Sequence, residues 1–322
     1  MTAPLLVTSS PHLRAADTTR RIMLDVILAL VPALGMAAWV FGPFVLVPVL
    51  LAVAGAMVGE YVMRVLILKR DNRLGDLSAI VTGILLGMNL PPSIPLPLAF
   101  LGGALATGFV KELFGGLGMN FMNPAMGARV FLFLAWPSAM TAWSAPVDAV
   151  AGPTPLAILK GQEAAGAVLP DLWHLFLGDK AGCLGETSVL ALLIGAAYLV
   201  ARRVIKLDIP VIYIATVGLL TWIFGGKAAL FSGNFAVHLL SGGLVLGAFF
   251  MATDYATQPV SRSGKVIYAL GLGLVTSVIR LATNYPEGVS FAVILLNCLV
   301  PMIDRYTVPR AFGTVTQGAR RA

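Results

Sequence analysis

Ten apolar stretches follow one another along the chain, separated by short segments that carry most of its charges. Several of them are shorter than the roughly 20 residues that a helix needs to cross the hydrocarbon of a membrane, or are interrupted by Pro and Gly. The pattern predicts an all-α protein with about ten transmembrane helices, some bent or half-spanning around an interior site. The stretches lie at 22–40, 44–67, 76–90, 96–112, 124–137, 187–201, 209–225, 237–252, 266–282 and 289–303.

The composition agrees with this pattern. Only 11% of the 322 residues are charged and 58% are hydrophobic, with a mean hydropathy of +0.89, whereas soluble domains carry about 25% charged residues. The net charge of +7 is interpreted as loop topology and not as affinity for nucleic acid, which would need an extended soluble surface. We therefore expect a polytopic membrane protein with no nucleic-acid partner.

The basic residues orient the predicted helices. If the N-terminus lies in the cytoplasm, most lysines and arginines fall on the cytoplasmic side, as the positive-inside rule requires. Only Lys160, Lys180, Lys227 and Arg280 then lie toward the outside. The predicted domains are a cytoplasmic N-terminal tail, a first membrane repeat, a periplasmic loop, a second membrane repeat and a cytoplasmic C-terminal tail, at 1–21, 22–137, 138–186, 187–303 and 304–322.

Two pairs of stretches resemble each other and indicate an internal repeat. LGGALATGFVK at 101–111 matches LGLGLVTSVIR at 270–280, and GILLG at 83–87 matches GLVLG at 243–247. Five predicted helices separate the copies, an odd number, so the second copy is inverted in the membrane. The alternative is chance similarity between Gly- and Leu-rich helices. The odd number of intervening helices, which was obtained independently, argues against chance. Inverted repeats place a substrate or cofactor site near their interface.

Two asparagines stand before a proline that opens a predicted helix. Asn120 and Asn123 precede Pro124, which is favoured in a first helical turn. Their amides offer donors and acceptors for a heteroaromatic ring, although the residues alone favour an Asn helix cap without a ligand. Asp254 ends another apolar stretch and is a candidate cap, ion ligand or cofactor contact.

Charged residues inside or beside apolar stretches are candidates for function. Glu60 and Arg64 are spaced as a helical ion pair, and we expect them to neutralise each other. Lys111 and Glu112 end a stretch and are expected to extend toward the membrane surface. The carboxylates Asp76, Glu186 and Glu287 lie at predicted membrane edges, where they are hypothetical contacts for a cation. Cys183 and Cys298 are predicted to be packing thiols, and neither they nor the three scattered histidines indicate a metal site.

The stretch DAVAGPTPLAILK at 148–160 holds a Gly-Pro-Thr-Pro turn. Pro155 favours an extended conformation at Thr154, Pro153 restricts the approach and Gly152 leaves clearance. This turn is predicted to display the Thr154 hydroxyl outside the membrane.

Several of these segments together resemble the family of RnfD and NqrB, the flavin-bearing membrane subunits of the Rnf and sodium-pumping NADH:quinone reductase complexes. The resemblance covers nearly the whole chain. It is carried by SPHLRAADTTRRIMLDVILALVPA (10–33), GMNFMNPAMGARVFLFLAWP (118–137), DAVAGPTPLA (148–157), GETSVLALLIGAA (185–197), FFMATD (249–254) and YPEGVSFAVILLN (285–297).

The resemblance implies two flavins. In this family the phosphate of FMN esterifies a threonine in a D-x-x-[ST]-G-A-[ST] motif, through a dedicated flavin transferase; Asp148, Gly152 and Thr154 match it. Ala151 and Pro153 depart from it, and the proline changes the backbone that the transferase meets. The N-x-x-N-P and M-A-T-D motifs lie near a non-covalent riboflavin in NqrB, which implies the same role for Asn120, Asn123 and Asp254.

The resemblance also implies a setting: a fold like that of the urea and ammonium transporters, the bacterial inner membrane, and the A, B, C, E and G proteins of the Rnf complex as partners. The chain would relay electrons between NADH and ferredoxin, coupled to Na⁺ or H⁺ translocation, and would not be active alone. The alternative is a channel or transporter for a small polar solute, which the same fold permits. A transporter has no need of a flavin-ester loop.

Overall fold

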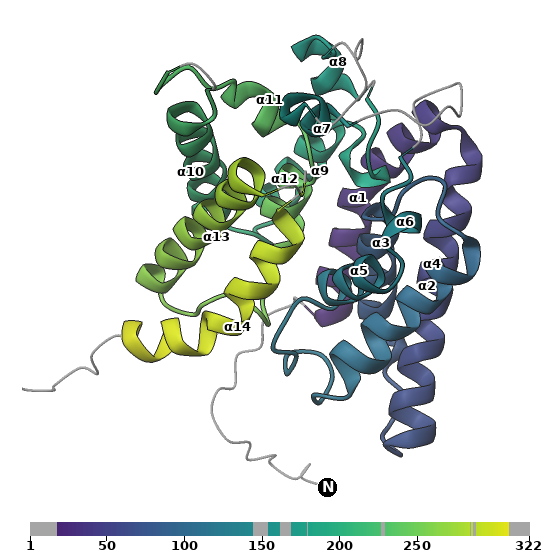
Figure 1. Cartoon of the computed structure of the whole chain (residues 1–322). Helices are drawn as coiled ribbons and strands as arrows, with labels where there is room; N and C mark the ends of the chain where they lie inside the picture. Colours follow the sequence, from purple (N-terminus) through teal and green to yellow (C-terminus); the bar gives the residue numbers. More distant parts are fainter. Residues whose placement is uncertain are drawn as a thin grey trace, which may run out of the picture.

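The computed structural model describes residues 18–143, 154–161, 169–178, 180–226, 229–283, 285 and 288–308, and these are helical with no strand among them (Figure 1). Each of the ten predicted stretches contains a helix. In the first half these are α1 (Thr19–Phe41), α2 (Leu46–Tyr61) between η1 (Pro43–Val45) and η2 (Val62–Ile67), α3 (Ser78–Met88) after η3 (Leu74–Asp76), α4 (Leu96–Ala104) continued by η4 (Leu105–Glu112), and α5 (Pro124–Ala135).

The second half follows a set of short helices. These are α6 (Pro137–Met140), α7 (Pro155–Lys160), α8 (Leu172–Leu177) and η5 (Leu184–Glu186). The apolar helices that follow are α9 (Val189–Ala201), α10 (Asp208–Phe224), α11 (Phe235–Leu240), α12 (Leu244–Leu246) continued by η6 (Gly247–Met251), α13 (Arg262–Ala282) and α14 (Val289–Thr307).

Four helical segments of the described chain are long and apolar enough to cross a membrane by themselves: Thr19–Phe41, Pro43–Ile67, Arg262–Ala282 and Val289–Thr307. Four shorter apolar helices are α3, α5, α9 and α10. The eighth stretch is broken, since α11 ends at Leu240 and α12 begins at Leu244 after Gly242 at φ +69°. The chain is thus a polytopic helical membrane protein, with short and interrupted helices of the kind that the sequence predicts.

The distribution of side chains is the one expected in lipid. Large apolar side chains such as Trp39, Phe44 and Leu134 are exposed on the outside of the helices. Charged side chains such as Lys111, Glu60 and Arg280 are instead almost completely buried. In hydrocarbon, apolar side chains can face the lipid, whereas charged side chains are stable only inside the bundle, where other groups of the protein pair with them.

Helix contacts follow one pattern in both halves of the chain. The second helix packs extensively on the fourth in each half, α2 on α4 and α10 on α13. The halves meet where α1 packs on α9 and where α5 packs on α14. These contacts place α3, α5, η5 and η6 in the middle of the bundle, between the two halves.

Glycines permit the close approach of α2 and α4. A Cβ atom added at Gly103 would lie 2.0 Å from the carbonyl oxygen of Ala52, and one at Gly55 would lie 2.0 Å from that of Phe100. Small residues at such positions let helix backbones touch, which is a main source of helix association in membranes.

We predict that Gly103→Ala destabilises the protein although alanine is the better helix former. The methyl group would force α2 and α4 apart at a cost of about 1–3 kcal/mol. The matched control is Gly35→Ala in α1, where nothing lies within 4 Å of the added atom, so that the propensity gain of roughly 0.5–1 kcal/mol remains. Thermal unfolding of the purified variants in detergent measures the stability change in each variant. Equal shifts of the melting temperature in the two variants would contradict the prediction.

Candidate functional site

Asn120, Asn123 and Asp254 meet in one cavity of about 100 Å³, which we call the amide cavity. It lies at the end of the bundle where α1, α3 and α5 begin and where η4 and η6 end. Lys111 and Ser78 also line it. The three residues that the sequence singles out, more than 130 positions apart at the extremes, are thus brought together by the fold.

Asn123 serves both as a helix cap and as a link to the second half of the chain. Its Oδ1 accepts a hydrogen bond from the Met126 N–H at 3.2 Å and so caps α5. Its Nδ2 donates to the Met251 carbonyl in η6 at 3.4 Å. The helix-cap interpretation is therefore confirmed, while the same side chain still borders the amide cavity.

Asp254 is held just beyond the end of η6. Its carboxylate accepts hydrogen bonds from the Ala256 N–H at 3.4 Å and the Thr257 hydroxyl at 3.3 Å. Burial raises the pKa of Asp254, against the opposing effect of these hydrogen bonds and of the Asn120 side chain. The cavity therefore contains a carboxyl group that resists ionisation beside two amides.

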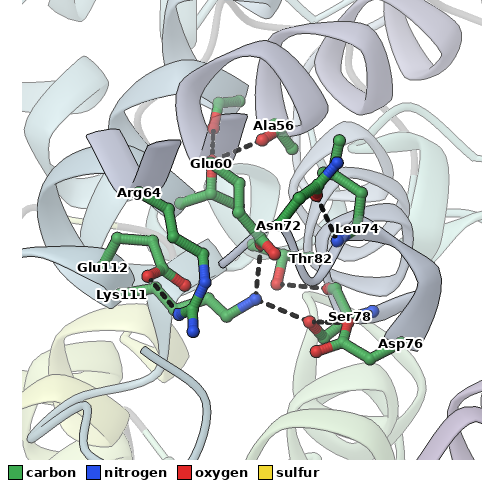
Figure 2. A network of polar contacts seen from close by, with 12 residues as sticks. Ala56, Glu60, Arg64, Asn72, Leu74, Asp76, Ser78, Thr82, Lys111 and Glu112 are labelled. Carbon is green, nitrogen blue, oxygen red and sulfur yellow. Dashed lines mark hydrogen bonds and ion pairs between the residues drawn. The ribbon is translucent and has the colours of Figure 1, made fainter. Parts of the chain in front are cut away.

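Two buried ion pairs lie next to the amide cavity (Figure 2). The Lys111 ammonium is 2.6 Å from Glu60 Oε2 and also donates to the Ser78 hydroxyl at 2.6 Å. Arg64 is 2.9 Å from Glu112. All four charged side chains are less than a tenth exposed. Lys111 thus connects the cavity wall to a charge network in the first half of the chain.

This pairing corrects two expectations from the sequence. Glu60 and Arg64 do not neutralise each other, and Lys111 and Glu112 do not extend to the surface. The physical reason is that η2 and η4 are π-helical and that η4 lies close against α2. Partners on the neighbouring helix are therefore nearer than the partner one turn away.

Asp76 belongs to the same network. Its Oδ1 accepts from the Ser78 N–H at 2.8 Å and from the Ser78 hydroxyl at 2.5 Å. Ser78 in turn accepts from Lys111. The carboxylate therefore orders the first turn of α3 and, through Ser78, the ammonium group at the cavity.

A line of buried polar groups leads from the amide cavity into the bundle. Beyond Asn123 and Met251, the Asn89 amide donates to the Met251 sulfur at 3.8 Å. The Cys183 thiol donates to the Asn89 carbonyl, and Arg129 donates to that sulfur, each at 3.3 Å. Sequence reasoning missed Asn89 and Arg129 and treated Cys183 as packing alone. An arginine in the middle of an apolar helix was the signal that could have found this line.

Thr154 does not line the amide cavity and lies at the start of the short helix α7. Its hydroxyl accepts a hydrogen bond from the Ala157 N–H at 3.2 Å, and only 4% of the residue is exposed. The prediction of a displayed hydroxyl was wrong, because Pro155 starts a helix and Thr154 becomes its N-cap. Asp148 and Gly152 lie outside the described residues, as does Glu287.

Three cations, one of them the last residue of α7, cap the ends of helices. Lys160 donates to the carbonyls of Thr283, at 2.7 Å, and of Tyr285, just after α13. Lys180 donates to the last carbonyls of α8 and α11, and Arg280 donates to the carbonyls of His238 and Ser241. Cations at helix C-termini are stabilised by the helix dipole. Through Lys160, α7 is attached to the chain just after α13 in the second half.

The charges of this group act on one another. Burial lowers the pKa of Lys180 to about 8, with Glu186 raising it and Arg280 lowering it. Burial and then Arg280 lower the pKa of Lys160. Glu186, in η5, is itself buried and supplies a negative charge to this cluster. Glu186 thus lies in a cationic region beside the end of α3, where the Leu184 N–H donates to the Leu90 carbonyl, whereas Asp76 lies just before the start of α3.

Comparison with known proteins gives end-to-end matches. Residues 6–313 match the family described as NQR2, RnfD, RnfE. The chain is 45% identical to the D component of the Na⁺-translocating ferredoxin:NAD⁺ oxidoreductase complex of Acetobacterium woodii, over 96% of this chain and 95% of the other. It is 42% identical to the D component of the proton-translocating ferredoxin:NAD⁺ oxidoreductase complex of Clostridium ljungdahlii, over 96% of each. It is 40% identical to the D component of the ion-translocating oxidoreductase complex of Stutzerimonas stutzeri, over 92% and 93%.

We predict that Lys111→Met destabilises the protein strongly, because it leaves the Glu60 carboxylate buried without its cation. Breaking one partner of a buried ion pair costs about 3–5 kcal/mol. The double variant Glu60→Gln, Lys111→Met removes both charges and is expected to recover much of the loss. Thermal unfolding in detergent tests the pair, and a double variant that is no more stable than the single one would refute it.

Proposed function

The chain belongs to the NQR2, RnfD, RnfE family, and from this premise we propose that it is the flavin-carrying membrane subunit of an ion-translocating ferredoxin:NAD⁺ oxidoreductase complex. It relays electrons between NADH and ferredoxin while Na⁺ or H⁺ crosses the membrane, and it works only with the other proteins of the complex. The observation that carries this proposal is the 45% identity to the D component of the Acetobacterium woodii complex over nearly the full length of both chains.

We propose that FMN is bound to Thr154 through a phosphoester, made by a flavin transferase. The arrangement of this residue fits the chemistry, since an ester oxygen at the same position keeps the ability to accept the Ala157 N–H bond. Because Thr154 is buried in its capping position, the first turn of α7 has to open while the transferase acts. Opening a cap costs only about 1 kcal/mol.

The amide cavity is the proposed site of a second flavin, riboflavin. The donors and acceptors of Asn120 and Asn123 suit the polar edge of an isoalloxazine ring, and the Asp254 carboxyl and the Lys111 ammonium border the same space. The cavity of about 100 Å³ is smaller than the 300–1,000 Å³ of common ligand sites. The cavity, which Ile22, Met23 and Val26 of α1 help to line, therefore has to widen when the ring binds.

When bound, the two flavins would supply the one- and two-electron chemistry, which amino-acid side chains are poorly suited to provide. The chain's own residues bind and orient. Asn123 fixes the start of α5 while its amide is tied to η6. Asn120 and Thr257 hold Asp254 in place, and Glu60 with Ser78 holds the Lys111 ammonium at the cavity wall.

The fold of the proposed subunit is two inverted five-helix repeats, like those of the urea and ammonium transporters. The equivalent pairs α2–α4 and α10–α13 and the equivalent buried cations Lys111 and Arg280 support this pairing. The positive-inside rule then puts both termini and the amide cavity at the cytoplasmic side of a bacterial inner membrane, and α7 at the periplasmic side. Asp76 and Glu186 would meet the transported cation at these two sides, together with Glu287.

We predict that Thr154→Ala abolishes covalent flavin. The wild-type chain, produced together with the transferase and then denatured, is expected to show in-gel flavin fluorescence, and the variant is expected to show none. Thr154→Ser keeps a hydroxyl and should keep fluorescence, and Thr221→Ala in α10 is a control for losing another buried threonine hydroxyl. Fluorescence that persists in Thr154→Ala would place the ester elsewhere.

We predict that Asp254→Asn weakens riboflavin retention without lowering stability. Burial opposes ionisation of this carboxyl and raises its pKa. At a pH above that raised pKa the buried carboxylate is charged, which destabilises the folded state. A neutral amide removes this destabilisation. Stability at neutral pH is therefore expected to stay equal or to increase, while riboflavin released on denaturation falls. Chromatography of the released flavin and thermal unfolding measure the two effects; riboflavin at the wild-type level would argue against the site.

A further inference from the structure

Two polar cavities lie beside the amide cavity, at the same end of the bundle. One, of about 270 Å³, lies between the start of α1 and the end of α9, and the other, of about 160 Å³, lies between the starts of α10 and α13. Arg203, Val204 and Tyr255 line both, and we call the two cavities together the basic pocket. Val204 and Tyr255 also line the amide cavity.

Cations outnumber carboxylates around the basic pocket. Five basic and two acidic side chains line it, which gives a formal net charge of +3. The basic residues are Arg21, Arg202, Arg203, Lys206 and Lys265. The acidic residues are Asp25 and Asp208. The positive-inside rule accounts for basic residues at this end of the bundle, but it does not require them to meet around one pocket. Basic pockets between membrane helices bind anionic lipid headgroups.

One of the two carboxylates is used to position a cation. Asp25 is buried, and its carboxylate accepts a hydrogen bond from the Tyr198 hydroxyl at 2.8 Å. It also accepts from Nε and Nη2 of Arg202, at 3.4 Å and 3.3 Å. These bonds hold the Arg202 guanidinium at the pocket wall, between α1 and the end of α9. A guanidinium is the cation whose planar donors best match a phosphate group.

Arg203 keeps a second guanidinium in the pocket at a position that favours glycine. The Arg203 N–H donates to the Val200 carbonyl and the Val204 N–H to the Leu199 carbonyl, both at 2.9 Å, and these bonds close the end of α9. Arg203 has φ +58°, a left-handed conformation that disfavours residues with a side chain. Residues held in such conformations cluster at functional sites. What arginine adds over glycine here is a positive charge in the pocket.

Apolar side chains lead away from the basic pocket along α1 and α9, which pack on each other. Leu24 and Leu28 are exposed and follow Arg21 on one face of α1, and Leu28 is about 10 Å from Arg21 along the helix axis. Ile194 of α9, eight residues before Arg202, is exposed as well. A molecule with an anionic head and apolar chains therefore matches this surface, whereas an acidic protein or a free phosphate would match the pocket alone.

We propose that the basic pocket binds the phosphodiester headgroup of an anionic phospholipid, whose acyl chains lie along the exposed apolar side chains of α1 and α9. Arg21, Arg202 and Arg203 bind the phosphate. The inference goes beyond the proposed function and does not depend on a bound flavin.

The bound lipid has a consequence for the amide cavity. Ile22, Val204 and Tyr255 line both spaces, and the Tyr255 hydroxyl donates to the Val204 carbonyl. A ligand that joins the start of α1 to the segment after α9 stabilises the conformation in which they lie together. The anionic lipid therefore stabilises one wall of the amide cavity.

The test measures how lipids stabilise the full-length chain in detergent. Phosphatidylglycerol is the anionic probe, phosphatidylcholine is the zwitterionic control, and glycerol phosphate is a headgroup without acyl chains. Thermal unfolding at increasing concentrations gives an apparent affinity for each probe, and native mass spectrometry counts the lipids that stay bound.

The variant is Arg203→Gly, and the matched control is Lys69→Gly. Lys69 also has a positive φ, +51°, but it lines neither cavity of the basic pocket. Glycine suits this backbone conformation, so both variants are expected to fold. Arg203→Gly is expected to weaken the apparent affinity for phosphatidylglycerol about fivefold, the contribution of one cation at an anionic membrane surface. Lys69→Gly is expected to leave that affinity unchanged.

The control separates a site from general attraction, because both variants lose one positive charge. Equal weakening in the two variants, or no weakening in Arg203→Gly, would overturn the proposal. Equal stabilisation of the wild-type chain by phosphatidylcholine would overturn the anionic headgroup. Stabilisation by glycerol phosphate as strong as that by phosphatidylglycerol would assign the pocket to a free phosphate and overturn the lipid.

The intact complex distinguishes a lipid from a partner protein. Phosphatidylglycerol that is retained by the wild-type complex and lost from the Arg203→Gly complex would support the proposal. A wild-type complex without phosphatidylglycerol, together with loss of another subunit in Arg203→Gly, would assign the pocket to an acidic partner and overturn it.

Discussion

A charge inside a helical membrane protein has to be neutralised by groups of the protein, and this constraint organises the bundle. Lys111 with Glu60 and Arg64 with Glu112 join η4 to the helices beside it. Arg280, in the second half, is bound by backbone carbonyls at the break after α11. Because removing one partner of such a pair is costly, these contacts set which helices lie together. They also leave a charged or polar group beside each region that we assign to a flavin.

The helix α5 connects the parts of the molecule on which the proposed function depends. It begins at a proline capped by Asn123, carries Arg129 near its middle, and packs on α14 of the other half. The amide cavity lies at its start, and a second cavity lined by aromatic side chains lies at its end. The two cavities therefore share one rigid element. A rigid element beside a cofactor site fixes position and orientation, which a protein contributes to electron transfer, since the chemistry belongs to the cofactor.

Some features of this arrangement could be predicted from the chain and others could not. Each of the ten stretches predicted from hydropathy contains a helix, because lipid demands apolar runs, whereas the short helices α6, α7 and α8 were not predicted. The family resemblance implied a common role for Asn120, Asn123 and Asp254, and the structure places all three around one cavity. The Glu60–Arg64 pair was wrong, since spacing along an α-helix does not foresee a π-helical turn and a nearer partner on another helix.

The sequence by itself determined that the chain is a helical membrane protein, where its helices lie, and to which family it belongs. These properties depend on local hydropathy and on short motifs, each of which is contained in a continuous segment of the chain. Only the tertiary structure decided that Thr154 is a buried helix cap, that Lys111 binds Glu60, and that aromatic side chains surround a cavity beside Arg129. Burial and pairing depend on which helices touch, and the backbone approach allowed by glycines such as Gly103 sets that contact.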